Sequence, residues 1–389
     1  MTATAEPLRP NTYQECAVAL GAANAQKRSI RIRGAGTKDY LGDLRPTDLL
    51  LETTALRGVV AHVPADLTVT VAAGTPLAEL GASLAREGQF LPLDPPHGAA
   101  ATIGGVVAAN STGFLRARYG GVRDQLIGTT TALVDGTIAQ AGGRVVKNVA
   151  GYDLNKLLIG SLGSLGVMVE CTFKVLPLPR SSDGLQASFR RGADAFAAAD
   201  AVARTPARAA SLVVESTARD AWRLLVLAQG DPSAVARTLA IASDAAAANG
   251  GTNERRDDIR LALDPLRELP AAGRGVIVRA SLPIAAQSAF ADVGTRLAGF
   301  RQLVADAASG IVRVHVESDE ANETAAADAL LAAARVCGGS AHVERRPDAL
   351  RASVSAWGDG DVPGLFLMKR LKQAFDPLGV LEPSRGVVR

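Results

Sequence analysis

The sequence contains few residues that could hold a metal ion or an iron–sulfur cluster. Its 389 residues include only three cysteines and four histidines. Cys16, Cys171 and Cys337 lie far apart and form no C-x-x-C pair, and the histidines are equally isolated. This pattern excludes a disulfide framework, a self-contained iron–sulfur site and a structural zinc site. Any redox chemistry would therefore need an organic cofactor or another chain.

Aromatic residues, blocks of like charge and long apolar runs are also scarce. Phe, Trp and Tyr make up 4% of the chain, and the formal net charge of +3 is spread without a Lys/Arg block, so nucleic acid is not an expected partner. No apolar run reaches the roughly 18 residues of a spanning helix, and the N-terminal MTATAEPLRP lacks the features of a signal peptide. The sequence predicts a cytoplasmic protein without a membrane span.

Glycine, by contrast, is abundant and clustered. The run from Pro92 to Gly120 is rich in Gly and Ala and lacks the periodicity of a packed helix. Side chains this small let a flat ligand lie against main-chain N–H and C=O groups, and Pro95-Pro96 keeps the entry rigid. The alternative interpretation is a Gly/Ala-rich surface loop.

A second glycine-rich stretch follows the first predicted strand. Residues 11–25 predict a helix and residues 29–33 a strand, which ends in Gly34–Asp39, GAGTKD. Consecutive N–H groups there can form an anion-binding nest, with Thr37 and Lys38 adding a hydroxyl and a positive charge. This suits a pyrophosphate, although a simple turn is the alternative. The stretch is neither a Rossmann fingerprint nor a P-loop.

Residues 1–179 predict an α+β domain. Its remaining elements are strands at 49–52 and 68–73, a short helix at 54–60, a helix at 75–88, a hairpin of 126–133 with 137–141 turned at Asp135-Gly136, a helix at 154–159, a bare loop at 160–166 and a strand at 167–176. The last strand alternates, with Val167, Cys171 and Phe173 expected on one face.

Residues 180–345 predict a second domain, in which Ala-rich helices alternate with short strands. The helices are expected at 193–204, 232–249, 283–298 and 320–337, and the strands at 212–215, 223–228, 275–280, 302–305, 311–316 and 341–344. This order predicts an antiparallel sheet with helices on one face, in two similar halves. Residues 249–260 predict a surface loop. Trp222 and Trp357 are either core residues or anchors for a partner.

The last segment, residues 346–389, is expected to return to the first domain. It contains a predicted helix at 363–375 with an apolar face and several basic residues. We expect the apolar face to pack against the first domain and the basic residues to be solvated.

Several of these segments, in this order, resemble one protein family. RGAGTKD, PPHGAAATIGGVVAANSTG, RYGGVRD and KNVAGYDLNKLLIGSLGSLGVM resemble the vanillyl-alcohol oxidase type of FAD-binding domain, the PCMH type. KNVAGYD and the C-terminal FDPLGVLEPSR are most similar to the FAD-binding subunits of bacterial glycolate oxidases. The resemblance covers roughly the first 180 and the last 30 residues. It implies an FAD-binding domain of two α+β subdomains, followed by a cap domain with an antiparallel sheet.

The resemblance also implies a bound FAD and a set of residues that contact it. The Gly34–Lys38 N–H groups would hold the pyrophosphate, the region of Thr102–Asn110 would pack along the ribityl chain and the ring edge, and Gly163–Val167 would approach the adenine or the ring. The implied cofactor-binding residues are Arg33, Gly34, Ala35, Gly36, Thr37, Lys38, Asp39, Pro95, His97, Gly98, Ala99, Ala100, Thr102, Ile103, Gly104, Gly105, Ala108, Asn110, Gly113, Tyr119, Gly120, Gly163, Gly166 and Val167.

The sequence departs from the family pattern in two places. Relatives that attach flavin covalently use a His or Cys, commonly a His in the pyrophosphate loop, whereas this loop has Ala35, Thr37 and Lys38. We therefore predict dissociable FAD. Relatives that oxidise 2-hydroxy acids carry a GDGN-type segment with paired histidines that bind a metal and the substrate carboxylate. The corresponding Gly310–His315, GIVRVH, lacks the acidic and amide residues and the second His.

The function implied is that of an FAD-binding subunit of glycolate oxidase, which oxidises glycolate to glyoxylate and passes electrons to partners. The implied partners are a homologous catalytic flavin subunit and an iron–sulfur subunit, through which the chain would be peripheral to the inner membrane. His97, Arg118 and Tyr119 are the candidate catalytic residues. The alternatives are a free-standing FAD-dependent 2-hydroxy-acid dehydrogenase, for example of D-lactate, and a flavin-binding scaffold without turnover.

Overall fold

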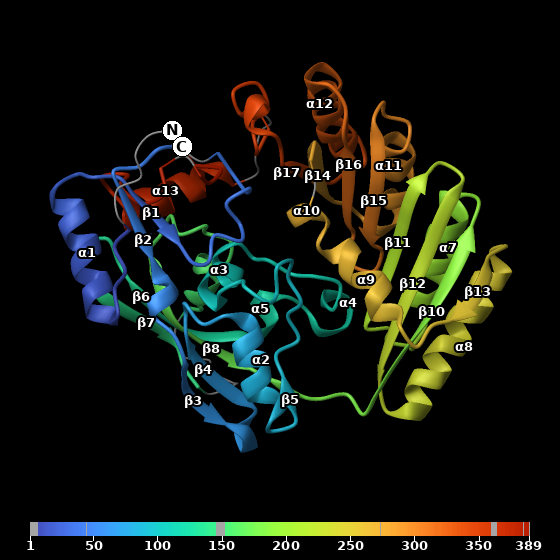
Figure 1. The fold of residues 1–389 in the computed structure, drawn as a ribbon, viewed down its shortest axis with the longest axis horizontal. Coiled ribbons are helices and arrows are strands. Elements are labelled where there is room, and N and C mark those ends of the chain that lie inside the picture. Colours follow the sequence, from blue (N-terminus) through green and yellow to red (C-terminus); the bar gives the residue numbers. More distant parts are fainter. Residues whose placement is uncertain are drawn as a thin grey trace. The chain divides into compact units, whose positions relative to one another are not determined.

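The chain divides into two compact units (Figure 1). The computed structural model describes residues 7–43, 45–144, 152–272, 274–358, 364–383 and 385–388. Unit 1 comprises residues 1–112, 120–178 and 360–389, and unit 2 comprises residues 113–119 and 179–359. The chain thus leaves unit 1 twice, first for a seven-residue segment and then for a long one.

The division differs from the expected domains in two respects. Residues 113–119, in the middle of the glycine-rich run, belong to unit 2. Residues 346–358, expected in the returning segment, also stay with unit 2, because Leu350 and Val354 lie in its core and Val343 N donates to Ala356 O at 2.8 Å. The return to unit 1 therefore begins at residue 360.

The main sheet of unit 1 has five antiparallel strands in the order β3-β4-β8-β6-β7. These strands are β3 (Val59–Val63), β4 (Thr68–Ala72), β6 (Leu126–Ala132), β7 (Ile138–Gly142) and β8 (Val167–Lys174). Helices α2 (Leu77–Ala85) and α3 (Ile103–Ala108) contribute to one hydrophobic core and α1 (Tyr13–Ala25) to another. Central strand β8 supplies side chains to both cores, so nearly all of it is buried.

A bulge in β8 changes the face to which its residues point. Strand β6 pairs with Glu170 and then with Met168, so Val169 is skipped. Because of this extra residue, Cys171 packs in the core of α2 and α3, whereas Val167 packs in the core of α1. The simple alternation predicted for residues 167–176 therefore holds only for the C-terminal half of the strand.

The glycine-rich run is more helical than its sequence predicts. It contains α3 and the short α4 (Arg116–Tyr119). Ile103, Val106 and Val107 have the spacing of one helix face and are all buried. The expected helix at 54–60 is instead a 3₁₀ turn at Thr53–Ala55 followed by β3. Most of the KNVAGYD motif, residues 147–151, lies outside the described residues.

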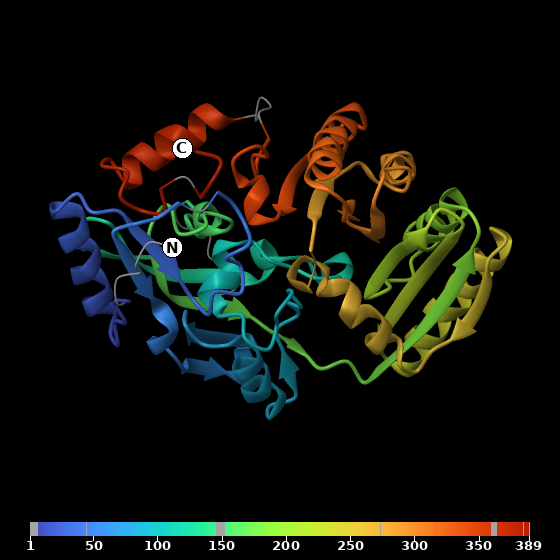
Figure 2. The ribbon, with the colours of Figure 1, turned by 45° about the horizontal axis from the view of Figure 1, so that its top comes forward.

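A small parallel sheet carries the glycine-rich loop of the N-terminal region. Strand β1 (Ile30–Arg33) pairs with β2 (Leu49–Glu52). The chain end after α13 (Leu365–Phe375) runs alongside β1, with Ile30 N donating to Val380 O at 2.8 Å and Glu382 N donating to Ile30 O at 2.9 Å. Figure 2 shows this C-terminal segment, in red, next to the blue N-terminal strands. Segments about 350 residues apart in sequence are thus hydrogen-bonded side by side.

Unit 2 is built on one eight-stranded antiparallel sheet in the order β13-β10-β12-β11-β15-β16-β14-β17. Helices α7 (Gly192–Ala203), α8 (Pro232–Ala248), α11 (Gln287–Gly294) and α12 (Glu320–Val336) pack on one face, as expected (Figure 1). The strands are β10 (Ser181–Phe189), β11 (Ser211–Ala218), β12 (Ala221–Gly230), β13 (Thr252–Arg255), β14 (Val276–Ser281), β15 (Phe300–Asp306), β16 (Ile311–Val316) and β17 (Ser340–Arg345).

The other face of this sheet is also partly covered. Helix α9 (Ile259–Arg267) packs its apolar residues there, with Phe114 from the segment that precedes α4. We call this the α9 face. Residues expected to form a surface loop, 249–260, instead provide the edge strand β13 and the start of α9. The remaining short elements are β5 (Gln89–Phe90), β9 (Leu176–Pro177), α5 (Val122–Gln125), α6 (Asn155–Leu158) and α10 (Leu269–Ala272).

The two tryptophans occupy different environments within unit 2. Trp222 is 2% exposed, packs edge-to-face on Phe196 with ring centroids 6.1 Å apart, and donates from Nε1 to Arg219 O at 2.8 Å. It is a core residue. Trp357 is half-buried, and its ring centroid lies 5.3 Å from that of His342.

Helix α13 packs on unit 1 with less of its apolar surface than expected, since Phe375 at its end contacts the core of α2 and α3 but is only partly buried. None of its residues is buried, and Phe366, Leu367 and Met368 are 65%, 52% and 42% exposed. Polar contacts also attach it to unit 1, since Lys372 Nζ donates to Ser164 O at 3.0 Å and to Leu381 O at 2.8 Å. No helix in the described part of the chain is long and apolar enough to cross a membrane.

Two helical glycines allow a test of how tightly the units are packed. A methyl group added at Gly81 in α2 would meet no atom within 4 Å, whereas one at Gly192 in α7 would lie 2.7 Å from the Trp222 ring. We expect Gly81→Ala to stabilise unit 1 by about 0.5–1 kcal/mol because it lowers the entropy of the unfolded chain. Gly192→Ala should destabilise unit 2 by about 1–3 kcal/mol through overpacking. Melting temperatures of the two variants check this, and a stabilised Gly192→Ala would contradict the packing.

Candidate functional site

Unit 1 contains a cleft between the end of β1 and the start of α3. The two glycine-rich stretches meet there, since a methyl group added at Gly34 would lie 2.1 Å from Thr102 Oγ1. The lining residues are Ile32, Arg33, Gly34, Ala35, Gly36, Thr37, Lys38, Asp39, Thr53, Thr102, Gly104, Gly105, Ala108, Ala109, Leu162, Gly163, Gly166, Val167, Met168 and Arg385. The third stretch singled out in the sequence, around Gly163, also lines the cleft.

The loop after β1 offers a row of hydrogen-bond donors to this cleft. Within the described part of the chain, the backbone N–H groups of Gly34, Ala35, Gly36 and Thr37 have no acceptor. The φ angle of Gly36 is +74°, a conformation that places successive N–H groups on one side of a turn and that glycine adopts without strain. The loop is therefore a nest suited to a phosphate oxygen.

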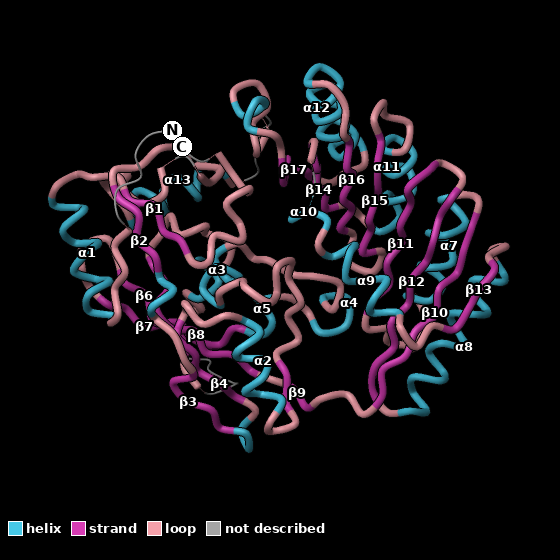
Figure 3. The backbone as a smooth tube through the Cα atoms, in the orientation of Figure 1, coloured by secondary structure: helices cyan, strands magenta, loops and turns pink. Residues whose placement is uncertain are grey.

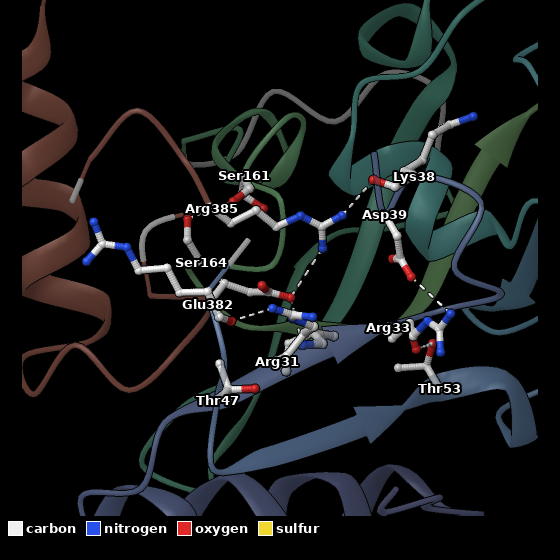
Figure 4. Close-up of polar contacts among 12 residues, drawn as sticks. Arg31, Arg33, Lys38, Asp39, Thr47, Thr53, Ser161, Ser164, Glu382 and Arg385 are labelled. Atoms are coloured by element: carbon white, nitrogen blue, oxygen red, sulfur yellow. Dashed lines mark hydrogen bonds and ion pairs between the residues drawn. The ribbon is translucent and has the colours of Figure 1, made fainter. Parts of the chain in front are cut away.

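Lys38 does not supply its charge to the cleft. Its side chain is buried, and Nζ donates to Pro96 O at 2.7 Å. The ammonium group thus ties the loop to the rigid Pro95-Pro96 entry and fixes its position. On the other side of the loop, Arg33 Nη2 lies 2.9 Å from Asp39 Oδ2 (Figure 4).

Arg385, from the C-terminal segment, lines the cleft together with Arg33 and Lys38. Arg385 is 7% exposed, and its Nη2 donates to Lys38 O at 3.0 Å. Figure 4 shows its guanidinium between that carbonyl and Glu382, whose Oε1 lies 3.4 Å from Nη1. Sequence reasoning missed this residue, although it ends FDPLGVLEPSR, a segment that resembles the family but to which the sequence assigns no role.

Glu382 connects Arg385 to β1. The same oxygen, Oε1, accepts a hydrogen bond from Ile32 N at 2.7 Å. Burial raises the pKa of Glu382, while the charge of Arg385 and the bond from Ile32 oppose that rise. The residue also has a φ of +42°, which is uncommon for a side chain of this size. The C-terminal segment that contains Val380, Glu382 and Arg385, which we call the tail, is therefore held by contacts to the strand that carries the nest.

The structure brings together most of the predicted cofactor-binding residues. The predicted residues that line the cleft are Arg33, Gly34, Ala35, Gly36, Thr37, Lys38, Asp39, Thr102, Gly104, Gly105, Ala108, Gly163, Gly166 and Val167. Those that do not line it are Pro95, His97, Gly98, Ala99, Ala100, Ile103, Asn110, Gly113, Tyr119 and Gly120. Ile103 is a core residue instead, 1% exposed.

The candidate catalytic residues have structural contacts of their own. Arg118 and Tyr119 belong to unit 2, where Arg118 Nη1 donates to Arg208 O at 3.0 Å and Tyr119 Oη donates to Gln229 Oε1 at 3.2 Å. Burial raises the pKa of Tyr119. His97 belongs to unit 1 and has a φ of +59°, and its carbonyl accepts hydrogen bonds from Ala100 N and Ala101 N.

Among the described residues that line the cleft, none is a His, Cys or Tyr. Such a side chain would be needed for a covalent bond to a flavin. Cys16 and Cys171 are buried in the hydrophobic cores of unit 1, and burial raises the pKa of each thiol to about 12. Among the described residues, no three His, Cys, Asp or Glu side chains are arranged to hold a metal ion.

Comparison with known proteins agrees with this geometry. The model of the FAD binding domain family matches residues 7–142, which include the nest and the start of α3. Over 164 residues the chain is 44% identical to the glycolate oxidase subunit GlcE of Escherichia coli (strain K12). The aligned stretch covers 42% of this chain and 46% of that protein.

A second relative matches a similar share of the chain. Over 184 residues it is 33% identical to the glycolate oxidase subunit GlcD of Bacillus subtilis (strain 168), which covers 47% of this chain and 39% of that protein. The matched stretches thus span less than half the length of these relatives. The family expected from the sequence is confirmed.

A solved structure extends the likeness to the whole fold. Superposition on p-cresol methylhydroxylase with substrate bound gives a TM-score of 0.75 at 17% identity and covers 98% of this chain and 88% of that one. At this identity the likeness concerns the fold alone. The fold class expected from the sequence, a PCMH-type FAD-binding domain with a second domain built on an antiparallel sheet, is confirmed.

The contact between Gly34 and Thr102 predicts a specific mutational coupling. Gly34→Ala should lower the FAD content of the purified protein at least tenfold, because the methyl group would displace Thr102 from the cleft wall. Gly34→Ala combined with Thr102→Ala should recover part of the FAD, since the closest remaining side-chain atom would be Cβ at 3.2 Å. Gly81→Ala is the control. Absorbance at 450 nm per chain measures the content, and full FAD in Gly34→Ala would contradict the proposed wall.

The burial of two cysteines predicts the reactivity of the thiols. At pH 8, Cys16 and Cys171 should remain protonated and unreactive because their pKa values are raised to about 12, whereas the half-buried Cys337 should react. A disulfide-exchange reagent should therefore titrate about one thiol per native chain and all three after unfolding. Rapid titration of two or more thiols in the folded protein would show that these cores are open.

Proposed function

We propose that this chain is the FAD-binding subunit of a glycolate oxidase, in which glycolate is oxidised to glyoxylate. The observation that carries the proposal is the cleft of unit 1, where four consecutive unpaired N–H groups face a wall of small residues. Such a surface binds a dinucleotide through its pyrophosphate. The similarity to GlcE supports the substrate. Bound FAD would supply the chemistry, by accepting a hydride from the carbon that bears the hydroxyl group.

In this proposal each part of the cleft has its own role. The N–H groups of Gly34–Thr37 would hold the pyrophosphate, and Gly104, Gly105 and Ala108 would leave room for the ribityl chain. Gly163–Val167 would contact the cofactor through main-chain groups. Arg385 would hold the loop through Lys38 O and add positive charge beside the phosphates.

FAD would be held without a covalent bond. The cleft offers no His, Cys or Tyr to attach it, so the affinity would rest on hydrogen bonds and on the enclosure provided by the tail. The electrons would then leave through partner subunits, namely a homologous catalytic flavin subunit, as the GlcD similarity suggests, and an iron–sulfur subunit. The chain would be cytoplasmic and peripheral to the inner membrane through these partners.

The role of the tail leads to a binding prediction. Arg385→Gln should weaken FAD binding about tenfold, the loss expected when a charge-assisted hydrogen bond worth about 1.5 kcal/mol is removed. The quenching of flavin fluorescence on titration of the apoprotein measures the affinity. Arg370→Gln, on the exposed surface of α13, is the matched control and should bind FAD as the wild type does. Equal affinity of all three proteins would contradict the role of Arg385.

The proposal as a whole is tested with the purified holoprotein and with its complex. Acid precipitation should release all the yellow colour into the supernatant, and flavin left on the protein would show covalent attachment.

The complex isolated by a tag on this chain should bleach at 450 nm when glycolate is added without oxygen, and the isolated chain should not turn over glycolate at that rate. Full activity of the chain alone, or with D-lactate in preference to glycolate, would favour a free-standing dehydrogenase. A flavin that substrate never bleaches in the complex would indicate a scaffold.

A further inference from the structure

A second group of charged residues lies within unit 2, on the α9 face of its sheet. Arg279 on β14 stands directly opposite Arg313 on β16 and His342 on β17 in the strand register. Glu344 lies at a bulge, since β14 pairs with Val343 and then with Arg345, and its ion pair with Arg313 places it with this group. These side chains lie on the strands where Figure 3 shows β14, β16 and β17 side by side.

Only one of the arginines in this group has a partner. Arg313 forms a two-pronged ion pair with Glu344, with Nε–Oε2 at 2.7 Å and Nη2–Oε1 at 3.1 Å. Arg279 and Arg116, the first residue of α4, form no hydrogen bond or salt bridge with any residue that the structure describes. An Arg carries five N–H donors, and those of Arg279 and Arg116 are open to a ligand.

The charges of this group indicate that a ligand of Arg279 and Arg116 would be negatively charged. Burial and the neighbouring charges of Arg313 and Arg116 lower the pKa of Arg279 to about 10. Burial and Arg279 lower the pKa of His342 to about 4, so the imidazole is neutral at pH 7. Arg313 and Arg279 lower the pKa of Glu344 to about 2 in spite of its burial. The charges of three arginines are thus opposed by Glu344 and by one further carboxyl group, Asp306.

Asp306 on β15 gives a second indication that the site is incomplete. It is 3% exposed, Oδ2 contacts Ser309 Oγ, and Oδ1 has no hydrogen-bond partner within the described chain. Burial raises its pKa to about 6, against the opposing effect of Ser309 and of Arg116 and Arg313. A buried carboxyl group without a full set of partners therefore lies close to arginines without acceptors.

We propose that Arg116 and Arg279 bind the carboxylate of a small organic acid. A guanidinium group pairs with a carboxylate through two parallel hydrogen bonds, and the low polarity of a half-buried site strengthens such a pair. Bound carboxylate would neutralise the repulsion among the three arginines, whereas a cation would increase it. Glu344 already neutralises Arg313, so the open donors are those of Arg279 and Arg116. This site belongs to unit 2 alone and does not depend on FAD.

The position of Trp357 provides a direct measurement of binding. Its ring lies against His342, which is opposite Arg279 in the sheet. In the full-length Trp222→Phe variant, Trp357 is the only tryptophan. Titration with glycolate, acetate or oxalate should change its fluorescence and saturate with a Kd below about 10 mM. Glycolate tighter than acetate would identify the substrate as the source of the carboxylate, and equal affinities would identify a general carboxylate site. Sulfate and phosphate at the same ionic strength should not saturate.

Matched variants decide whether the proposed arginines are responsible. Arg279→Gln and Arg116→Gln should each weaken binding at least tenfold, and Arg237→Gln, on the exposed side of α8, should leave it unchanged. A carboxylate response that survives both substitutions would overturn the proposal, as would the same response to sulfate as to the carboxylates.

The ring protons of His342 give an independent reading in the otherwise unmodified protein. Carboxylate binding should raise the pKa of His342 from about 4, because it offsets the positive charge of Arg279 that helps to lower it. Arg279→Gln should raise the same pKa without ligand. An NMR pH titration that shows no change with saturating glycolate would count against the proposal even if the Trp222→Phe variant fails to fold.

Discussion

The candidate cofactor site depends on the contact between the C-terminal segment and β1. Glu382 accepts the Ile32 N–H, Val380 accepts the Ile30 N–H, and Arg385 reaches the Lys38 carbonyl. Closing a loop of about 350 residues has an entropic cost, which grows only slowly with length, and several buried hydrogen bonds offset it. The strand, the nest after it and the guanidinium beside the nest are therefore positioned by a single set of contacts.

The polar groups between α13 and the tail find hydrogen-bond partners within unit 1 itself. Asp376 is buried and accepts from Val380 N at 3.0 Å and from Leu381 N at 2.8 Å, and Lys372 pairs with the same carboxylate at 2.5 Å. Charged groups thus fold the C-terminal segment on α13, in addition to the apolar contacts of Phe375, Val380 and Leu381 with the cores of unit 1. This explains how α13 can stay attached while Phe366 and its neighbours remain exposed. The N–H groups of Val380 and Leu381 thus have acceptors, whereas those of Gly34–Thr37 have none within the described chain and are available to a ligand.

Much of the fold could be predicted from the sequence, because the signals were local. The hairpin at Asp135-Gly136 formed as expected from its turn residues, and the helix at 13–25 begins after Thr12, whose hydroxyl accepts from Glu15 N. The bulge at Val169 could not be predicted, since it is set by the pairing of β8 with β6. That residues 113–119 belong to unit 2 also depends on long-range contacts and could not be predicted, because Phe114 is buried by distant residues such as Leu225.

The candidate site shows the same contrast between local and long-range information. Bare loops can be recognised from glycine alone, and Gly34 and Gly104 do line one cleft. The direction of a charged side chain cannot be recognised in this way. The ammonium group of Lys38, expected to face the pyrophosphate, donates to Pro96 O, and Arg385, about 350 residues away, adds a cation to the cleft lining. The positions of these two cations cannot be predicted from the net charge of the chain. They depend on which carbonyl groups the fold brings within reach of each side chain.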